Sequence, residues 1–181
     1  WKRSRTIFLF KKGDPEEVGS WRPISIAPCG YRIVSSHIAR TLGKLNMEEH
    51  FVSKNQKGFL PGIAGTIEHS AKIRELIAIA SGDKRSIHIA AIDISNAFSA
   101  VPHQLIKTNL EHIGMPKRFT KLIGDIYDSS VTQVELNGVK AETTTIRNGV
   151  RQGCPLSPYL FNIAIDPLVR HIEERKSELG F

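Results

Sequence analysis

Alternating apolar and polar residues predict strands at two places along the chain. The runs 5–12 and 21–27 predict the two strands of an antiparallel hairpin. A second hairpin is predicted over 131–136 and 139–146, because the pair Asn137 and Gly138 between these runs is typical of a tight turn. Residues 87–92 form an apolar run without formal charge, so we expect a buried strand over 87–93.

Apolar residues at helical spacing predict helices between these strands. The pattern indicates helices from about residue 31 to 49 and from about residue 66 to 80. Pro102 and Pro116 each stand where proline fits the first turn of a further helix. A last helix is expected from Ser157 past Ile172, with a kink or an interruption at Pro167. These elements predict an α+β fold, with a mostly antiparallel sheet packed on helices.

Asp93 closes the apolar run 87–92 and leads directly into a turn. A carboxylate in this position lies at the edge of the predicted sheet. A hard cation such as Mg²⁺ binds such an oxygen, especially when phosphates supply further ligands. The alternative is that Asp93 only caps the strand or the following turn.

Residues 149–162 form a polar, glycine-containing loop that continues into the last predicted helix. Ser157 suits the N-cap position of that helix and Pro158 its first turn. Gly153 allows a ligand to approach the backbone closely, and the amide of Gln152 offers both a donor and an acceptor to a sugar or a base. The alternative is an ordinary loop before a well-capped helix.

Four blocks of sequence follow one another in a recognisable order. Residues 93–103 have the pattern Asp-x-x-x-Ala-Phe-x-x-Val-x-His, and residues 151–158 have Arg-Gln-Gly-x-Pro-Leu-Ser-Pro. Upstream, Lys-Gly-Asp at 12–14 is followed by Trp-Arg-Pro-Ile-Ser-Ile at 21–26, and Gln-x-Gly-Phe stands at 56–59. Together these blocks resemble the reverse transcriptases of non-LTR retrotransposons, and they are most similar to the R2 group.

The resemblance implies the fingers and a partial palm of a right-hand polymerase. Residues 1–85 would form the fingers region, and residues 86–181 a partial palm truncated before the family's Asp-Asp block. The sequence contains no two adjacent aspartates. The implied function is that of an RNA-directed DNA polymerase fragment, with two-metal nucleotidyl transfer in the intact parent and no activity in these residues alone.

The resemblance also assigns roles to individual residues. Asp93 would be a catalytic metal ligand together with the carbonyl group of Ile94, for two Mg²⁺ or Mn²⁺ ions. Lys12 and Arg22, on facing strands of the first hairpin, would bind the triphosphate. Phe98 would lie under the sugar and exclude a 2′-hydroxyl group, and Gln152 and Gly153 would contact the nucleotide. Two alternatives are that Phe98 is a core residue and that Lys12 is a solvated lysine on an edge strand.

The composition agrees with these expected partners, which are an RNA template, a DNA primer and deoxynucleoside triphosphates. The net charge is +7 and the pI about 9.6, which favours binding to polyanions. Two cysteines without metal-ligand spacing predict a reduced intracellular compartment, and the family suggests the nucleus. No apolar run is long enough to span a membrane. The sequence does not indicate an oligomeric state.

Two further functions stay open. One is a noncatalytic RNA-binding remnant of a retroelement. The other is a reverse transcriptase and maturase of the group II intron type, although the Pro-Leu-Ser-Pro motif at 155–158 favours a retrotransposon.

Overall fold

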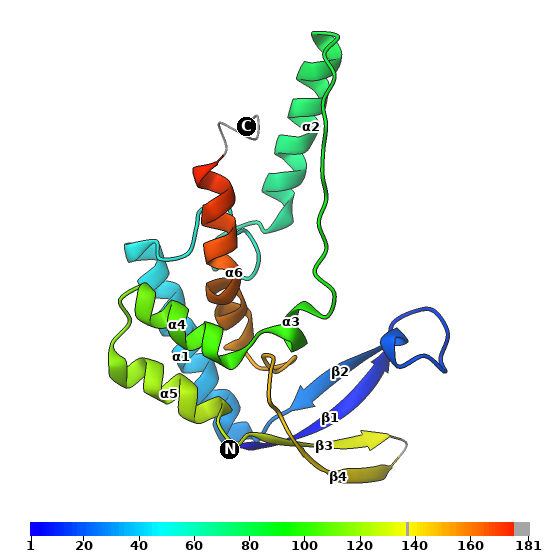
Figure 1. Ribbon diagram of the computed structural model, residues 1–181, viewed down its shortest axis with the longest axis vertical. Coiled ribbons are helices and arrows are strands. Elements are labelled where there is room, and N and C mark those ends of the chain that lie inside the picture. Colours follow the sequence, from blue (N-terminus) through cyan, green and yellow to red (C-terminus); the bar gives the residue numbers. More distant parts are fainter. Residues whose placement is uncertain (137, 176–181) are drawn as a thin grey trace.

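The computed structural model describes residues 1–136 and 138–175, and a four-stranded mixed sheet forms one end of it. The strands are β1 (Arg3–Phe10), β2 (Trp21–Ile26), β3 (Val131–Leu136) and β4 (Val139–Thr145), in the order β2-β1-β3-β4 (Figure 1). β1 pairs antiparallel with β2 and parallel with β3, and β3 pairs antiparallel with β4. The predicted α+β class and the mostly antiparallel sheet are therefore confirmed.

Both predicted hairpins are present, and the sheet joins them through β1 and β3. A 3-10 turn, η1 (Val18–Ser20), stands just before β2 in the connection of the first hairpin. The hydroxyl groups of Thr6 and Thr132 lie 2.8 Å apart across the central β1–β3 pair. This parallel pair places the first strand of the chain beside a strand more than a hundred residues later, and no local pattern in the sequence predicts it.

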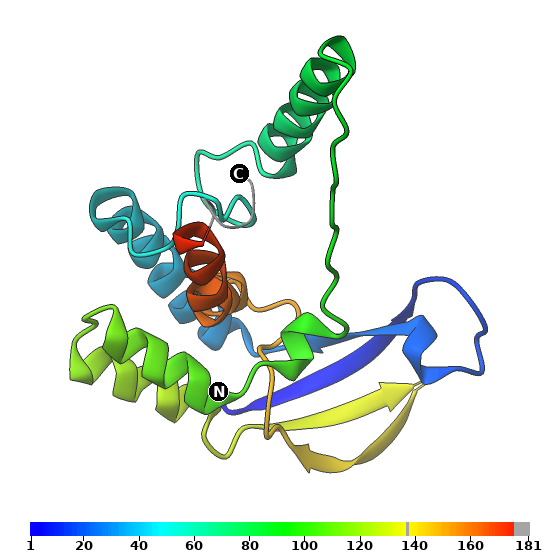
Figure 2. The same ribbon diagram turned by 45° about the horizontal axis from the view of Figure 1, so that its top comes forward.

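Four helices gather at one end of the sheet and enclose the core (Figures 1 and 2). They are α1 (Cys29–Glu49), α4 (His103–His112), α5 (Lys117–Tyr127) and α6 (Ser157–Glu174). Their inward faces bury Leu42, Leu110, Ile123 and Leu160 almost completely. Burial of these side chains is the main stabilising contribution to this layer. α6 continues through Pro167 as a single helix, so the expected interruption is absent.

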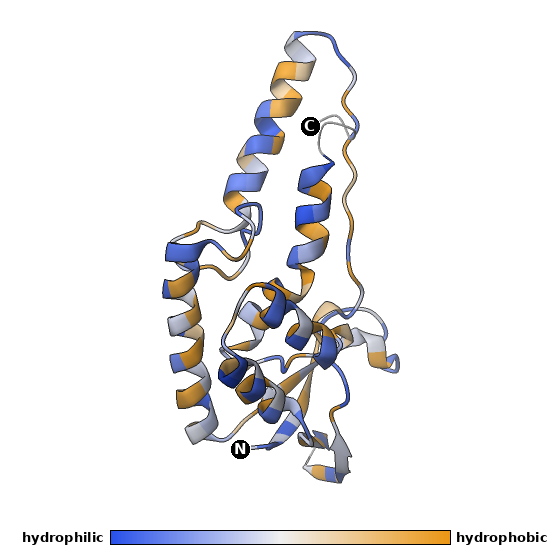
Figure 3. Cartoon of the chain, turned by 60° about the vertical axis from the view of Figure 1, so that its left-hand side comes forward, coloured by the Kyte–Doolittle hydropathy of each residue, from blue (hydrophilic) through white to orange (hydrophobic). Residues whose placement is uncertain are grey.

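The helix α2 (Thr66–Gly82) and the extended segment after it stand away from this core (Figure 1). Apolar positions recur along both of them (Figure 3), yet α2 buries none of its residues. The strand predicted over residues 87–93 is wrong, because this segment has no strand pairing within the described part of the chain and Ile92 is 86% exposed. An extended segment becomes a strand only when a neighbour satisfies its N–H and C=O groups. A short helix, α3 (Ala97–Ala100), follows it.

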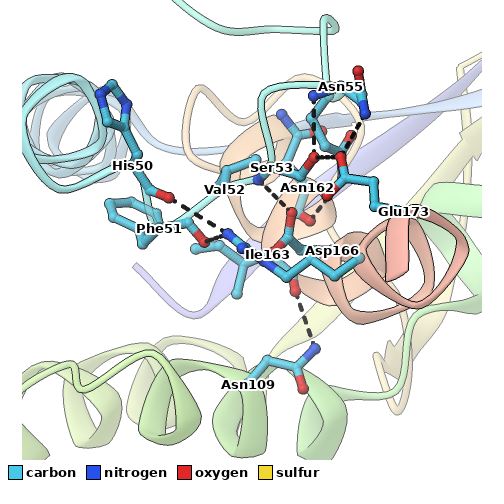
Figure 4. A network of polar contacts seen from close by, with 12 residues as sticks. His50, Phe51, Val52, Ser53, Asn55, Asn109, Asn162, Ile163, Asp166 and Glu173 are labelled. Carbon is cyan, nitrogen blue, oxygen red and sulfur yellow. Dashed lines mark hydrogen bonds and ion pairs between the residues drawn. The ribbon is translucent and has the colours of Figure 1, made fainter. Parts of the chain in front are cut away.

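A polar network fastens the loop after α1 to α6 (Figure 4). The buried carboxylate of Asp166 accepts a hydrogen bond from the backbone N–H group of Ser53 at 2.7 Å and one from Arg170 Nε at 2.5 Å. Arg170 also donates to the carbonyl group of Phe51 at 3.0 Å, and Asn55 donates to Glu173 at 2.6 Å. This network holds the loop that leads to the Gln-x-Gly-Phe block at 56–59.

Among the helices of residues 1–136 and 138–175, none combines the length and the apolar character that a membrane crossing requires.

Candidate active site

The loop at 148–153 packs directly on the segment that follows Asp93. Val150 N donates to the carbonyl group of Phe98 and Gly149 N to that of Val101, both at 2.7 Å. His103 Nε2 lies 2.9 Å from the carbonyl oxygen of Gly149, to which it donates. Gly149 has φ +89°, and a Cβ atom there would lie 2.7 Å from the carbonyl oxygen of Ser99. Only glycine allows this close approach, which joins two of the four sequence blocks.

The other side of the same loop contacts β2. The backbone N–H group of Ser25 donates to the carbonyl group of Gln152 at 2.8 Å. Gly153 has φ +102°, and a Cβ atom there would lie 3.0 Å from the carbonyl oxygen of Ser25. A pocket of about 210 Å³ opens between these segments, and its lining includes Pro23, Ser25, Ser99 and Gln152. The structure therefore brings Gln152 and Gly153 to the strand that carries Arg22.

Phe98 is half-buried in an aromatic cluster. Its ring centroid lies 4.8 Å from that of Phe161 on α6 and 5.9 Å from that of Phe59. Phe59 belongs to the Gln-x-Gly-Phe block, so this cluster brings a third block to the same place. The tilted rings are a favourable arrangement for aromatic pairs. Phe98 thus packs at the margin of the core, directly beside the loop that carries Gln152.

The two basic residues predicted to bind the triphosphate are exposed on the first hairpin. Arg22 lies on β2 opposite Leu9 of β1. Lys12 lies in the turn beyond β1, because that strand ends at Phe10. The expectation that the two cations stand on facing strands is therefore wrong for Lys12. The position in the turn leaves its long side chain unconstrained by the sheet.

Asp93 and Ile94 lie on the exposed extended segment between α2 and α3. Within residues 1–136 and 138–175, no group of three or more His, Cys, Asp or Glu side chains is arranged to hold a metal ion. Mg²⁺ requires about six oxygen ligands, and several of them must come from carboxylates, phosphates or water. The described residues offer one carboxylate here and do not complete a metal site, so the metal role of Asp93 stays a prediction.

Arg151 is a further residue of this region that the sequence analysis did not single out. Its guanidinium group is buried, donates to Ser130 Oγ at 2.7 Å and lies over the Tyr31 ring, 5.0 Å from its centroid. Burial raises the pKa of Tyr31, whose hydroxyl group lies 3.2 Å from Cys154 Sγ. The ion pairs of the described residues do not include Arg151. Arg151 therefore links the loop to α1 and to Ser130, the residue before β3.

Comparison with known proteins gives the same family over almost the whole chain. Residues 10–180 match the family described as "Reverse transcriptase (RNA-dependent DNA polymerase)". The chain is 32% identical over 170 residues to the Retrovirus-related Pol polyprotein from type-1 retrotransposable element R2 of Popillia japonica, covering 93% of this chain and 23% of that protein. It is 30% identical over 178 residues to the Retrovirus-related Pol polyprotein from type-2 retrotransposable element R2DM of Drosophila melanogaster, covering 98% and 16%.

A third relative is the Transposon TX1 uncharacterized 149 kDa protein of Xenopus laevis, which is 29% identical over 178 residues, covering 98% of this chain and 13% of that protein. The chain thus spans less than a quarter of the length of each of these relatives.

Proposed function

The chain belongs to the reverse transcriptase family, and from that membership we propose that it forms the fingers (residues 1–85) and part of the palm (residues 86–181) of an RNA-directed DNA polymerase of a non-LTR retrotransposon. The observation that carries this proposal is the junction at 148–153. There one loop contacts both the Phe98 segment and the strand that carries Arg22. We expect an RNA template, a DNA primer and deoxynucleoside triphosphates as partners, and the nucleus as the location.

The proposed nucleotide pocket lies at this junction. Gln152 and Gly153 are held against β2, so the Gln152 amide would face the sugar or the base and Gly153 would leave room for the nucleotide. Arg22 would bind the triphosphate through two parallel hydrogen bonds, while Lys12 in the turn would add a point charge. From this exposed turn the long side chain of Lys12 would reach the triphosphate without a constraint from the sheet.

Phe98 would select deoxynucleotides. Its ring is held in place by Phe161 and Phe59, so it would resist displacement by a 2′-hydroxyl group on the incoming sugar. The close packing of glycine at 149 against Ser99 fixes the backbone beside this ring. Core packing and sugar selection are compatible roles, because one face of a half-buried ring can contact the substrate.

The family implies a divalent metal. In a complete enzyme Asp93 and the carbonyl group of Ile94 would each give one oxygen to Mg²⁺ or Mn²⁺, and the other carboxylates would come from the Asp-Asp block. Two such ions, when bound, stabilise the attacking and the leaving oxygen atoms of nucleotidyl transfer. The extended, exposed backbone at 87–94 would leave the Asp93 side chain accessible to the substrate.

The test uses what we call the extended enzyme, a polypeptide in which these 181 residues are continued by a segment that carries the family's Asp-Asp block. We expect it to add a single deoxynucleotide to a DNA primer on an RNA template, and to need Mg²⁺ or Mn²⁺. The 181-residue chain by itself should add none. Robust metal-dependent synthesis by the short chain, or none by a folded extended enzyme, would contradict the proposal.

A noncatalytic RNA-binding protein is the second candidate. The net charge of +7 favours it, because a basic protein can bind RNA through phosphate contacts without any metal site. A folded extended enzyme that binds RNA but incorporates no nucleotide would support this candidate.

A further inference from the structure

The outer face of α1 carries a row of positive charges outside the candidate active site. Arg32, His37, Arg40 and Lys44 are all exposed on this helix. The run from residue 18 to 47 contains no Asp or Glu and is the longest such run in the chain. The ion pairs of the described residues include none of the three permanent cations. Their charges are therefore available to a partner.

The opposite face of α1 fixes this row in space. Tyr31 and Leu42 are each 2% exposed, and Ile38 is also buried, so the helix cannot rotate its charged face inward. Arg32 and Arg40 stand eight residues apart, about 12 Å along the helix, and Lys44 follows one turn later, about 6 Å beyond Arg40. α1 runs along the periphery of the molecule, on the left in Figure 3.

The row borders a shallow hollow of about 550 Å³, lined by Cys29, Arg32, Ile33, Ser36, His37 and Arg40. Guanidinium groups and a serine hydroxyl group along one side of a hollow can donate several hydrogen bonds to phosphate oxygen atoms. Ile33, 71% exposed, adds one apolar contact.

We propose that the cation row of α1, defined as Arg32, Arg40 and Lys44, binds the phosphate backbone of an RNA strand. The proposal rests on the proposed function, which supplies the RNA, and adds a binding surface to it. The row is complementary to a polyanion, since no Asp or Glu interrupts residues 18–47, and the proposed function supplies RNA as that polyanion. A membrane surface is disfavoured because an interfacial helix inserts its apolar face, and that face of α1 is in the core.

The experiment compares four forms of the 181-residue chain by fluorescence anisotropy with a labelled single-stranded RNA. One form is unaltered, one carries Arg32→Ala, Arg40→Ala and Lys44→Ala, and the control carries Lys117→Ala, Arg118→Ala and Lys121→Ala on α5. The control also loses three positive charges from an exposed group, in which Lys121 pairs with Asp125. The fourth form carries Arg32→Lys and Arg40→Lys and retains the charges. Circular dichroism verifies that all four forms keep their helix content.

We expect the α1 variant to bind RNA on the order of ten to a hundred times more weakly at moderate salt. It lacks the three phosphate contacts through which the unaltered chain releases counterions when it binds. The slope of log K against log salt should become less steep by about 2, at about 0.7 for each lost contact. The α5 control should change much less, and the lysine form should recover most of the affinity.

Equal weakening of the α1 and α5 variants would mean that only net charge matters and would overturn the inference, while leaving the proposed function intact. Binding of the same forms to phosphatidylserine vesicles is measured in parallel. If the α1 variant loses vesicle binding while its RNA affinity is unchanged, the inference is also overturned. If the unaltered chain binds no RNA, the inference fails, whereas the polymerase proposal is judged separately by nucleotide incorporation in the extended enzyme.

Discussion

The side-chain amide of Asn109 donates a hydrogen bond to the carbonyl oxygen of Ile163 at 3.0 Å (Figure 4). It also lies 3.2 Å from the carbonyl oxygen of Ala164. Pro167 has no N–H group, so the Ile163 carbonyl loses its usual donor four residues along the helix, and the proline ring crowds this turn. α4 therefore supplies from outside the hydrogen bond that α6 lacks, which explains why α6 is not interrupted.

We predict that Asn109→Leu lowers the free energy of unfolding by about 1–3 kcal/mol, because it leaves the Ile163 carbonyl group without a donor. In a Pro167→Ala background the helix provides its own donor to Ile163. The same substitution at 109 should then cost less by about 1 kcal/mol. Urea denaturation of the four proteins in this double-mutant cycle measures the coupling. Strictly additive effects would show that Asn109 stabilises the protein by packing alone.

The elements that depend on local pattern were predictable from the sequence. The two hairpins, the helices α4 and α5 and the apolar stripe of α1 follow from local pattern and spacing alone. The family blocks likewise identified the loop at 149–153 and the segment at 93–103, which the structure joins through Gly149 and Val150.

The features that depend on distant partners were not predictable. The strand expected at 87–93 fails because apolar character indicates a tendency to be buried but does not supply the neighbouring strand. Glu173 accepts a hydrogen bond from Asn55, which lies more than a hundred residues away in the sequence. The burial of Arg151 likewise depends on Tyr31 and Ser130, which no local pattern relates to it.

His103 gives a prediction about pH. Burial lowers the pKa of its imidazole group, and the nearby charges of Lys107 and Arg151 lower it further, against the opposing effect of its hydrogen bond to Gly149. The unfolded chain, with a His pKa of about 6.5, therefore binds a proton more readily than the folded chain. The contribution of His103 to stability is complete above about pH 6.5 and is lost as the pH falls through the lower folded pKa.

Urea denaturation across this pH range should show stability decreasing toward acid. His103→Gln should flatten that decrease, while the control His37→Gln, at an exposed position on α1, should leave it unchanged. A decrease of the same size in the His103→Gln variant would show that other groups cause it.

Asp93 gives a prediction about catalysis in the extended enzyme. Asp93→Asn should reduce nucleotide incorporation by at least about a hundredfold, because an amide replaces an anionic oxygen ligand of the metal. RNA affinity should stay within about twofold, since it depends on phosphate contacts spread over many basic residues. Asp128→Asn, at another exposed aspartate, is the matched control and should preserve both properties. Parallel loss of incorporation and RNA binding would indicate that Asp93 has a structural role.

Phe98 gives a prediction about sugar selection in the extended enzyme. Phe98→Val should raise the incorporation of ribonucleotides relative to deoxynucleotides by about tenfold or more, because a smaller side chain removes the steric penalty on a 2′-hydroxyl group. Val should be tolerated better than Ala, since the ring also packs against Phe161 and truncation leaves a cavity. Single-nucleotide incorporation with matched pairs of ribo- and deoxynucleoside triphosphates measures the ratio.

Two substitutions distinguish this effect from a general loss of nucleotide binding. Arg22→Ala should weaken the use of both sugars alike, because the lost contact is to phosphate, and Gln152→Ala should also reduce nucleotide use. A Phe98→Val enzyme that is folded, retains its activity and keeps the original sugar preference would establish that the ring is only a core residue. The pocket would then have to lie on another side of the loop that Gly149 and Ser25 hold in place.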